Sequence, residues 1–281
     1  MIPMIHQDQT PRSSHPIPHG TAHQRLQSTV TALGFLLTSI LCLTPAFLSA
    51  QQYGLEVEVV NEDIGVLVGA LGSTDLTGYT CYRAYITMQN EDDFLSSISG
   101  DAVNPTYITT TTTFSNAALG AVTPNGINSL LFSVYPDLEF DTWVTIGLDG
   151  VPDAAAGEAA VSTVQSSSNQ WATALNPGAD IDGSSVAIDD PLGGAWYALN
   201  GDANGVAGTE LRVLAGQFVT DGDLSLQFYT QIFINGNGLN EVPGADGAAR
   251  PTYIWPSTVA EGCTDAAACN YDADAGVDDG S

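Results

Sequence analysis

The sequence of 281 residues contains no lysine, only five arginines and only four histidines. All four histidines and two of the arginines precede residue 30, namely His6, His15, His19, His23, Arg12 and Arg25. Nucleic-acid binding needs lysine or arginine to neutralise phosphates, and so does attraction to an anionic membrane surface. The scarcity of basic side chains therefore nearly excludes nucleic acid as a partner.

The same scarcity removes most catalytic chemistry from the region after residue 30. Serine, cysteine and zinc hydrolases generally use histidine as a base or a ligand, and Schiff-base enzymes need lysine. Glycoside hydrolysis by two carboxylates stays open, because it needs only two acids about 5 to 10 Å apart. With 32 acidic residues, some pairs of acids lie close by chance, so their number decides nothing. We expect no enzymatic activity.

Residues 29–50 form an apolar segment that follows Arg25 and ends in Ser49-Ala50. A basic residue, an apolar run interrupted by proline and a small-residue pair are typical of a signal peptide, and an uncleaved membrane anchor is the alternative. We expect cleavage after Ala50, export to the cell surface or the extracellular space, and no membrane span afterwards. Residues 1–50 contain Asp8 and two arginines, so the remainder has 31 acidic and three basic residues. Such a charge attracts divalent cations.

Residues 51–255 show the pattern of short strands separated by Gly, Asn and Asp turns. Alternating apolar and polar residues predict strands at 55–59, 79–88, 130–135, 142–148, 211–219 and 224–234. Asp221-Gly222 between the last two predicts a hairpin, the threonine run 109–113 predicts an exposed strand, and 154–175 favours a loop over a helix. The absence of β-α-β alternation predicts an all-β fold, specifically an antiparallel β-sandwich.

Residues 250–256 are typical of a linker, and the segment that follows, 262–281, reads GCTDAAACNYDADAGVDDGS. It holds six oxygen-bearing side chains within residues 265–279, and its glycines allow the backbone to curl so that carbonyls join them. The expected calcium ligands are Asp265, Asn270, Asp272, Asp274, Asp278 and Asp279. A solvated acidic tail is the alternative interpretation of the same acids.

The segments G-C-T-D, A-C-N-Y and D-D-G-S resemble the calcium-binding repeat found in tandem in secreted proteins of marine Bacteroidota, which is similar to thrombospondin type 3 repeats. The resemblance implies calcium as the bound ion and a chain that stops before the repeat's closing cysteine. Cys263 and Cys269 have five residues between them in a chain expected to be secreted, which favours a local disulfide, although the repeat's third cysteine is absent. Cys81 is expected to be a small core residue.

Two further segments invite comparison with known families. Gly201-Asp202-Ala203-Asn204-Gly205 resembles the opening of a dockerin calcium loop, but it is short for one, and a turn before a strand is the favoured interpretation. Residues 82–85, 140–147 and 191–197 resemble an uncharacterised secreted domain that precedes such calcium repeats. That resemblance implies no activity.

Four tryptophans remain as candidates for ligand binding. Trp143 and Trp196 lie within apolar runs and are expected in the core, whereas Trp171 lies among Ser, Asn and Gln and is the candidate for an exposed sugar-binding surface. The sequence thus predicts a secreted, non-catalytic structural or adhesive module that binds calcium and acts at the cell surface or in the extracellular matrix. A carbohydrate-binding module is the alternative, with polysaccharide or another surface protein as partner, and a carboxylate-pair glycoside hydrolase comes after it.

Overall fold

The computed structural model describes residues 52–70, 72–256, 260–261 and 275–277. These residues form mostly strands and short turns, and both large sheets are antiparallel, so the all-β prediction is confirmed. Within the described residues, no helix has the length and apolar character needed to cross a membrane.

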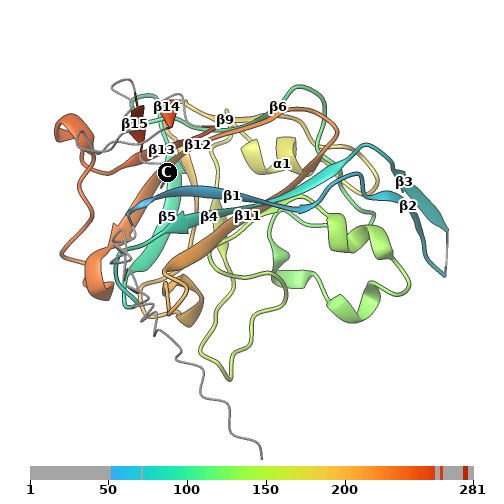
Figure 1. Cartoon of the computed structure of the whole chain (residues 1–281), viewed down its shortest axis with the longest axis horizontal. Coiled ribbons are helices and arrows are strands. Elements are labelled where there is room, and N and C mark those ends of the chain that lie inside the picture. Colours follow the sequence, from blue (N-terminus) through green and yellow to red (C-terminus); the bar gives the residue numbers. More distant parts are fainter. Residues whose placement is uncertain (1–51, 71, 257–259, 262–274, 278–281) are drawn as a thin grey trace, which may run out of the picture. The chain divides into compact units, whose positions relative to one another are not determined.

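The smaller of the two large sheets has four strands and lies toward the viewer in Figure 1. Its order is β1 (Gly54–Asn61), β4 (Thr80–Thr87), β11 (Arg212–Thr220) and β7 (Trp143–Val144). In β4 the side chains of Ala84 and Ile86 are fully buried, while Arg83 and Tyr85 point to the opposite face and stay partly exposed. The period-two pattern of the sequence therefore separates an inner from an outer face.

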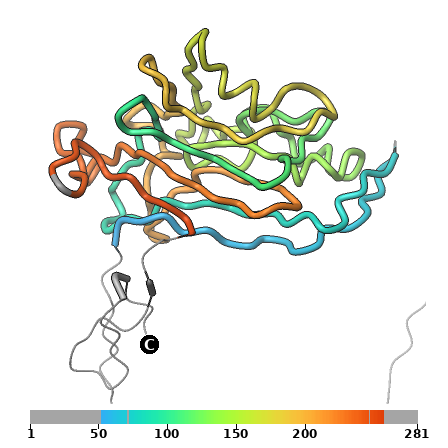
Figure 2. Tube along the Cα trace, turned by 90° about the horizontal axis from the view of Figure 1, so that it is seen from above, coloured from blue at the N-terminus to red at the C-terminus, as the bar shows by residue number. Residues whose placement is uncertain are grey.

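The larger sheet has seven strands. Its order is β8 (Ser162–Val164), β10 (Gly194–Tyr197), β5 (Phe94–Gly100), β12 (Leu224–Phe233), β6 (Thr106–Thr110) and β9 (Val186–Ile188), and β13 (Thr252–Trp255) also pairs with β12. The segment 250–256, predicted as a linker, thus contains an edge strand, and that prediction is wrong for residues 252–255. β13 passes close to β1, as Figure 2 shows, and the ring of Trp255 in β13 lies 6.1 Å from that of Tyr82 in β4.

Two small sheets complete the strands. β2 (Gly65–Val68) and β3 (Ser73–Leu76) form a hairpin that projects beyond the larger sheets in both views (Figures 1 and 2), and β14 (Ala260–Glu261) pairs in parallel with β15 (Ala275–Val277). The helical turns are short: η1 (Pro124–Gly126), η2 (Ser129–Leu131), η3 (Pro136–Phe140), α1 (Trp171–Leu175), η4 (Ala203–Gly205), η5 (Ile234–Gly236) and η6 (Ala245–Gly247).

The inner faces of both large sheets contribute to one hydrophobic cluster. It includes Ile86 of β4, Phe218 of β11, Trp196 of β10 and Phe228 of β12, and the rings of Phe218 and Phe228 lie 6.5 Å apart. A second, smaller cluster lies on the outer face of the four-stranded sheet and consists of Ala117, Ile127, Leu138, Trp143 and Leu214. Residues 117–140 therefore cover part of that outer face, and this cover creates the site described below.

The predicted hairpin at residues 220–223 is wrong. β11 pairs with β4 and β7, whereas β12 pairs with β5, β6 and β13, so the turn connects the two sheets. Residues 111–115 lie beside this turn. The N–H of Thr111 donates to Asp223 O, and the N–H of Ser115 donates to Val219 O. Gly222 suits this position because a side chain there would meet the hydroxyl groups of three threonines.

The predicted strand at 130–135 is also wrong, and the one at 142–148 shortens to β7. Asn128 caps η2 by accepting a hydrogen bond from the N–H of Leu130 at 3.0 Å, and Pro136 then begins η3. The alternating apolar residues of this segment therefore belong to helical turns and do not share one buried face; Leu130, for example, is 82% exposed. Of the threonine run, only Thr109 and Thr110 belong to β6, and in 154–175 the structure has β8 and the five-residue α1 instead of a loop throughout.

Candidate functional site

The predicted calcium ligands and the cysteines Cys263 and Cys269 lie outside the described residues. This holds for Asp265, Asn270, Asp272, Asp274, Asp278 and Asp279. Backbone pairing of β14 with β15 brings residues 260–261 next to residues 275–277. Among the described residues, no group of three or more His, Cys, Asp or Glu side chains is arranged to hold a metal ion.

Trp171 does not form the exposed surface that the sequence suggested. Its side chain is 1% exposed, its indole N–H donates to Val164 O at 2.9 Å, and its ring lies 5.6 Å from that of Trp196. Gly194 lies directly against the indole, where a larger residue would collide with it. Although its neighbours in the sequence are polar, Trp171 is buried and fixes the start of α1 against the core. Trp143 and Trp196 are buried, as expected.

The loop at Gly201–Gly205 uses its polar side chains within the fold. Asp202 accepts a hydrogen bond from the N–H of Leu199, and the buried Asn204 accepts from Ala159 N–H and donates to Ile146 O. These contacts support the turn interpretation over a calcium loop. Cys81 is 1% exposed, and burial raises the pKa of its thiol to about 12, as suits a structural residue.

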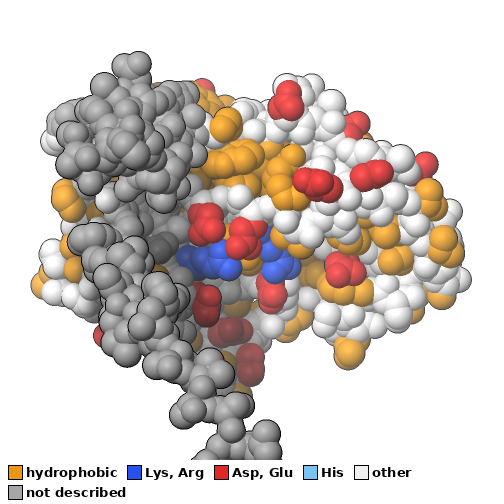
Figure 3. All heavy atoms as spheres, viewed as in Figure 1, with side chains coloured by type: hydrophobic (Ala, Val, Ile, Leu, Met, Phe, Trp, Pro, Cys, Tyr) orange, Lys and Arg blue, Asp and Glu red, His pale blue; other side chains and the backbone are white. Residues whose placement is uncertain are grey.

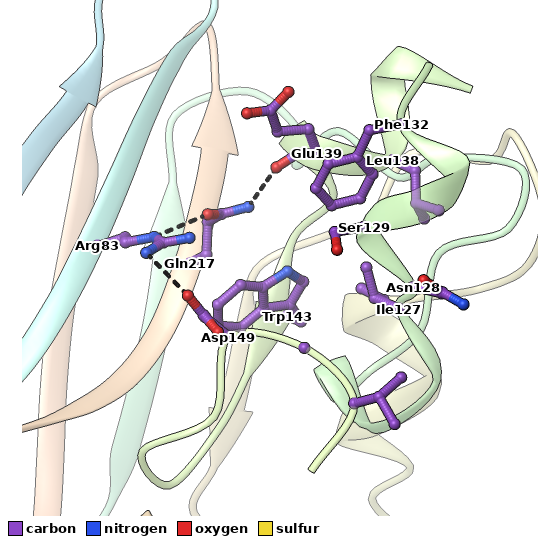
Figure 4. Close-up of a pocket in the computed structure, with 12 residues that line it drawn as sticks. Arg83, Ile127, Asn128, Ser129, Phe132, Leu138, Glu139, Trp143, Asp149 and Gln217 are labelled. Atoms are coloured by element: carbon purple, nitrogen blue, oxygen red, sulfur yellow. Dashed lines mark hydrogen bonds and ion pairs between the residues drawn. The ribbon is translucent and has the colours of Figure 1, made fainter. Parts of the chain in front are cut away.

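A pocket of about 360 Å³ lies on the outer face of the four-stranded sheet. Its sheet side is formed by Arg83 of β4, Gln217 of β11 and Trp143 of β7, and its other sides by residues 127–129, 132, 138–139 and 149–151 (Figure 4). The polar sheet face and the covering turns thus meet around a space that is within the usual range of ligand pockets.

Arg83 is held in this pocket by three neighbours. Its Nε donates to Gln217 Oε1 at 3.1 Å, its guanidinium carbon lies 5.9 Å from the centre of the Trp143 ring, and its Nη1 is 3.8 Å from Asp149 Oδ2. Gln217 is itself 2% exposed and donates to the carbonyl oxygens of Glu139 and Asp141. The guanidinium is therefore fixed in direction, while most of its N–H groups have no protein acceptor at hydrogen-bond distance in the described part of the chain.

The indole N–H of Trp143 is a second donor in the pocket. The N–H groups of Trp171 and Trp196 each donate to a backbone carbonyl, but that of Trp143 has no acceptor among the residues described. Figure 4 shows it directed toward Ser129, across the pocket. The site thus offers donors from two directions and the carboxylate of Asp149 as an acceptor.

Sequence reasoning missed this site. The sequence predicts Trp143 in the core, which is correct for its burial but leaves out its indole N–H, which has no acceptor in the part of the chain that the structure describes. The usable signal was Arg83, one of three basic residues after residue 50, on the polar face of a predicted strand. The other two arginines also have carboxylate partners, Arg212 with Glu58 and Arg250 with Glu241, and Figure 3 shows basic and acidic side chains gathered over the four-stranded sheet.

Asp141 lies behind the pocket and is fully buried. Burial raises the pKa of its carboxyl to about 7, although the N–H groups of Ala117 and Ala121, each 2.9 Å away, act in the opposite direction. Its two oxygens hold the loop that carries residues 117–121 against the sheet.

Comparison with known proteins identifies no relative: no family model, no curated protein and no solved structure matches this chain.

Proposed function

We propose that the chain is a secreted, non-catalytic structural or adhesive module. In this proposal the signal peptide ends at Ala50, residues 51–255 form a β-sandwich domain, and residues 262–281 form a calcium-binding repeat after a short linker. The shared hydrophobic cluster of the two large sheets supports the sandwich. The acidic composition and the spacing of cysteines and glycines at 262–281 support the repeat.

The non-catalytic assignment rests on the burial and the hydrogen bonds of the Asp141 carboxyl. A glycosidase acid has a raised pKa and must reach the substrate. Among the described carboxyl groups, Asp141 is the one whose pKa rises to about 7, yet it is fully buried and both its oxygens accept backbone hydrogen bonds. Its raised pKa thus follows from burial, and both of its oxygens are occupied by the loop at 117–121, which favours a binding role over hydrolysis.

Export and hydrolysis are tested on the protein released by the producing cells. N-terminal sequencing is expected to begin at Gln51, and incubation with a panel of polysaccharides is expected to release no reducing sugar. An intact N-terminal segment on a cytoplasmic protein contradicts export. Sugar release that disappears in Glu139→Gln or Asp149→Asn contradicts the non-catalytic assignment.

Calcium binding is tested by titration calorimetry of the exported chain. We expect a dissociation constant on the order of 10⁻⁴ to 10⁻³ M, as in extracellular calcium modules. The double variant Asp272→Asn/Asp274→Asn is expected to lose this binding. The control, Asp189→Asn/Glu210→Gln, removes two exposed carboxylates from the strand-rich region and should bind as the unchanged protein does. Equal affinity in all three proteins would assign the cluster to a solvated acidic tail.

Carbohydrate binding is the second candidate. It loses the support of Trp171, which is buried, and gains that of the Arg83 pocket, which combines aromatic, amide and charged side chains.

A further inference from the structure

We propose that the Arg83 pocket binds one uncharged sugar residue. The proposal deepens the adhesive function by naming its ligand, and it rests on that function for the expectation that the sugar is bound without being cleaved.

The hydrogen-bonding groups of the pocket match vicinal hydroxyl groups. A sugar hydroxyl both donates and accepts, so a sugar is held best where donors and acceptors alternate. Arg83 and the Trp143 indole supply donors, and Asp149, paired with Arg83 through one contact of 3.8 Å, supplies an acceptor beside them. Because the side chain of Asp149 is 71% exposed, this ion pair is weak and leaves both groups available to a ligand.

The remaining wall is apolar and suits the carbon face of a sugar ring. Its accessible apolar side chains are Phe132, which is partly exposed, and Val151, which is 56% exposed; Ile127 and Leu138 are buried behind them, and Asn128 and Ser129 lie beside them. Figure 4 shows the Phe132 ring opposite the Arg83 and Trp143 side chains. A ligand between these two sides therefore has polar contacts on one side and apolar contacts on the other. A small hydrocarbon would make no hydrogen bonds to the polar side, and an ion would gain nothing from the apolar side.

The charge of the pocket favours an uncharged ligand. Among the lining residues Arg83 supplies one positive charge and Asp149 one negative charge beside it, in a chain whose formal net charge is −27. An anionic ligand would meet repulsion both within the pocket and from the rest of the protein. A cationic ligand is attracted by the net charge of the chain, but inside the pocket it would meet the guanidinium of Arg83, whose direction is fixed by Gln217.

The pocket is preorganised, which reduces the entropy that binding costs. Gln217 donates to two backbone carbonyls while it accepts from Arg83, so the guanidinium does not have to be ordered by the ligand. On the other side, the Asn128 cap holds η2, and with it Ser129, in place.

The test uses the full exported chain and methyl glycosides of glucose, galactose and mannose, with methyl glucuronide as the charged comparison. Saturation-transfer NMR and titration calorimetry are expected to show millimolar binding of at least one neutral glycoside and weaker binding of the glucuronide. Affinity for the neutral ligand should change less than twofold when the salt concentration is raised. If none of the three neutral glycosides binds, or if the glucuronide binds more tightly, the proposal is wrong.

Two variants locate the site. Arg83→Gln removes the guanidinium and is expected to weaken binding at least tenfold, whereas Arg212→Gln, which makes the same charge change on the same sheet outside the pocket, should leave it unchanged. Ser129→Phe fills the pocket from an exposed position and should abolish binding without altering thermal unfolding, which keeps the test valid if Arg83→Gln destabilises the fold. Unchanged affinity in Ser129→Phe overturns the proposal. Cleavage of a bound glycoside would contradict the proposed non-catalytic function while leaving the binding site confirmed.

Discussion

The loops around Asp93 and Asp141 are each held by a fully buried carboxylate, but the pKa values of the two groups move in opposite directions. Burial alone would raise both. Asp93 accepts from the Tyr53 hydroxyl at 2.8 Å, from the N–H groups of Asn90 and Asn235, and from two further donors, and together these lower its pKa. Asp141 has fewer donors, all of them from the backbone, and its pKa rises to about 7.

At Asp93 the hydrogen-bond donors outweigh the effect of burial on the pKa, whereas at Asp141 burial, with the nearby charge of Asp137, outweighs the donors. At neutral pH the Asp93 region is held by a charge that its surroundings favour, whereas the Asp141 carboxyl, with a pKa of about 7, is partly protonated because burial opposes its charge. The raised pKa of Asp141 therefore reflects burial of a loop anchor, and by itself it does not indicate an acid catalyst.

The largest expected effect comes from removing the better-paired carboxylate. Asp93→Ala leaves several buried donors without an acceptor and should lower the free energy of unfolding by about 4 kcal/mol. Asp141→Ala also removes an unfavourable charge, so its loss at neutral pH should be smaller, about 2 kcal/mol. Urea denaturation compares the two, with the exposed Asp189→Ala as the control. An equal or larger loss in Asp141→Ala would break the comparison.

The next effect tests how closely the Asp141 loop is packed. A methyl group at Gly120 would run into the Asp141 carboxyl, whereas one at Gly126 has nothing within 4 Å. Gly120→Ala is expected to lower the free energy of unfolding by about 3 kcal/mol, and Gly126→Ala to change it by less than about 0.5 kcal/mol. Chemical denaturation of both variants checks this. If Gly120→Ala is as stable as Gly126→Ala, the loop does not depend on close contact with the carboxylate.

The pH dependence of stability should have opposite signs in the two regions. The pKa of Asp141 is about 7 in the folded protein against 3.8 as the ordinary value, so the folded state holds the proton more tightly, and its contribution to stability falls as pH rises from about 4 to 7. The slope is at most about 1.4 kcal/mol per pH unit. The lowered pKa of Asp93 gives stability that is present above 3.8 and is lost as pH falls below it.

Urea denaturation at several pH values measures both effects. Each is the difference in the free energy of unfolding between the unchanged protein and one variant, followed as a function of pH. The difference between the unchanged protein and Asp141→Asn should shrink or reverse as pH rises toward 7. The difference from Asp93→Asn should shrink only below about pH 4. Parallel profiles for all three proteins would show that neither carboxyl has the pKa assigned to it.

The smallest expected effect removes one donor of Asp93. Tyr53→Phe should lower the free energy of unfolding by about 1 kcal/mol, because the other donors remain. Tyr197→Phe is the matched control, since that hydroxyl has no hydrogen bond to a described residue. Thermal unfolding of both variants decides this, and equal midpoints would show that Tyr53 contributes nothing to the Asp93 network.

The sequence predicted the long strands well where one face is buried and the other is not. Residues 55–59, 79–88, 211–219 and 224–234 correspond to β1, β4, β11 and β12. It failed at 130–135, because a cap at Asn128 and Pro136 turn the same apolar alternation into helical turns. It missed β5, where serines interrupt the apolar pattern, and β10, which has only four residues.

The candidate pocket was less predictable than the strands. Arg83 and Gln217 are 134 residues apart, and their contact depends on the register between β4 and β11. Trp171 was predicted to be exposed because its neighbours in the sequence are polar. In the structure it is buried, because Gly194 and Trp196 pack against it.

The sequence by itself determined the all-β class, the faces of the long strands and the scarcity of basic groups, because these follow from residue type and local spacing. Only the tertiary structure decided that Asp221-Gly222 connects two sheets, that Trp171 is buried and that Arg83 meets Trp143 beneath residues 127–139. A turn residue specifies that the chain reverses, but the partner of each strand is chosen by packing between residues far apart in the sequence. At 220–223 the backbone of residues 111–115 forms hydrogen bonds with Val219 and Asp223, so these residues pair with the threonine segment and not with each other as in a hairpin.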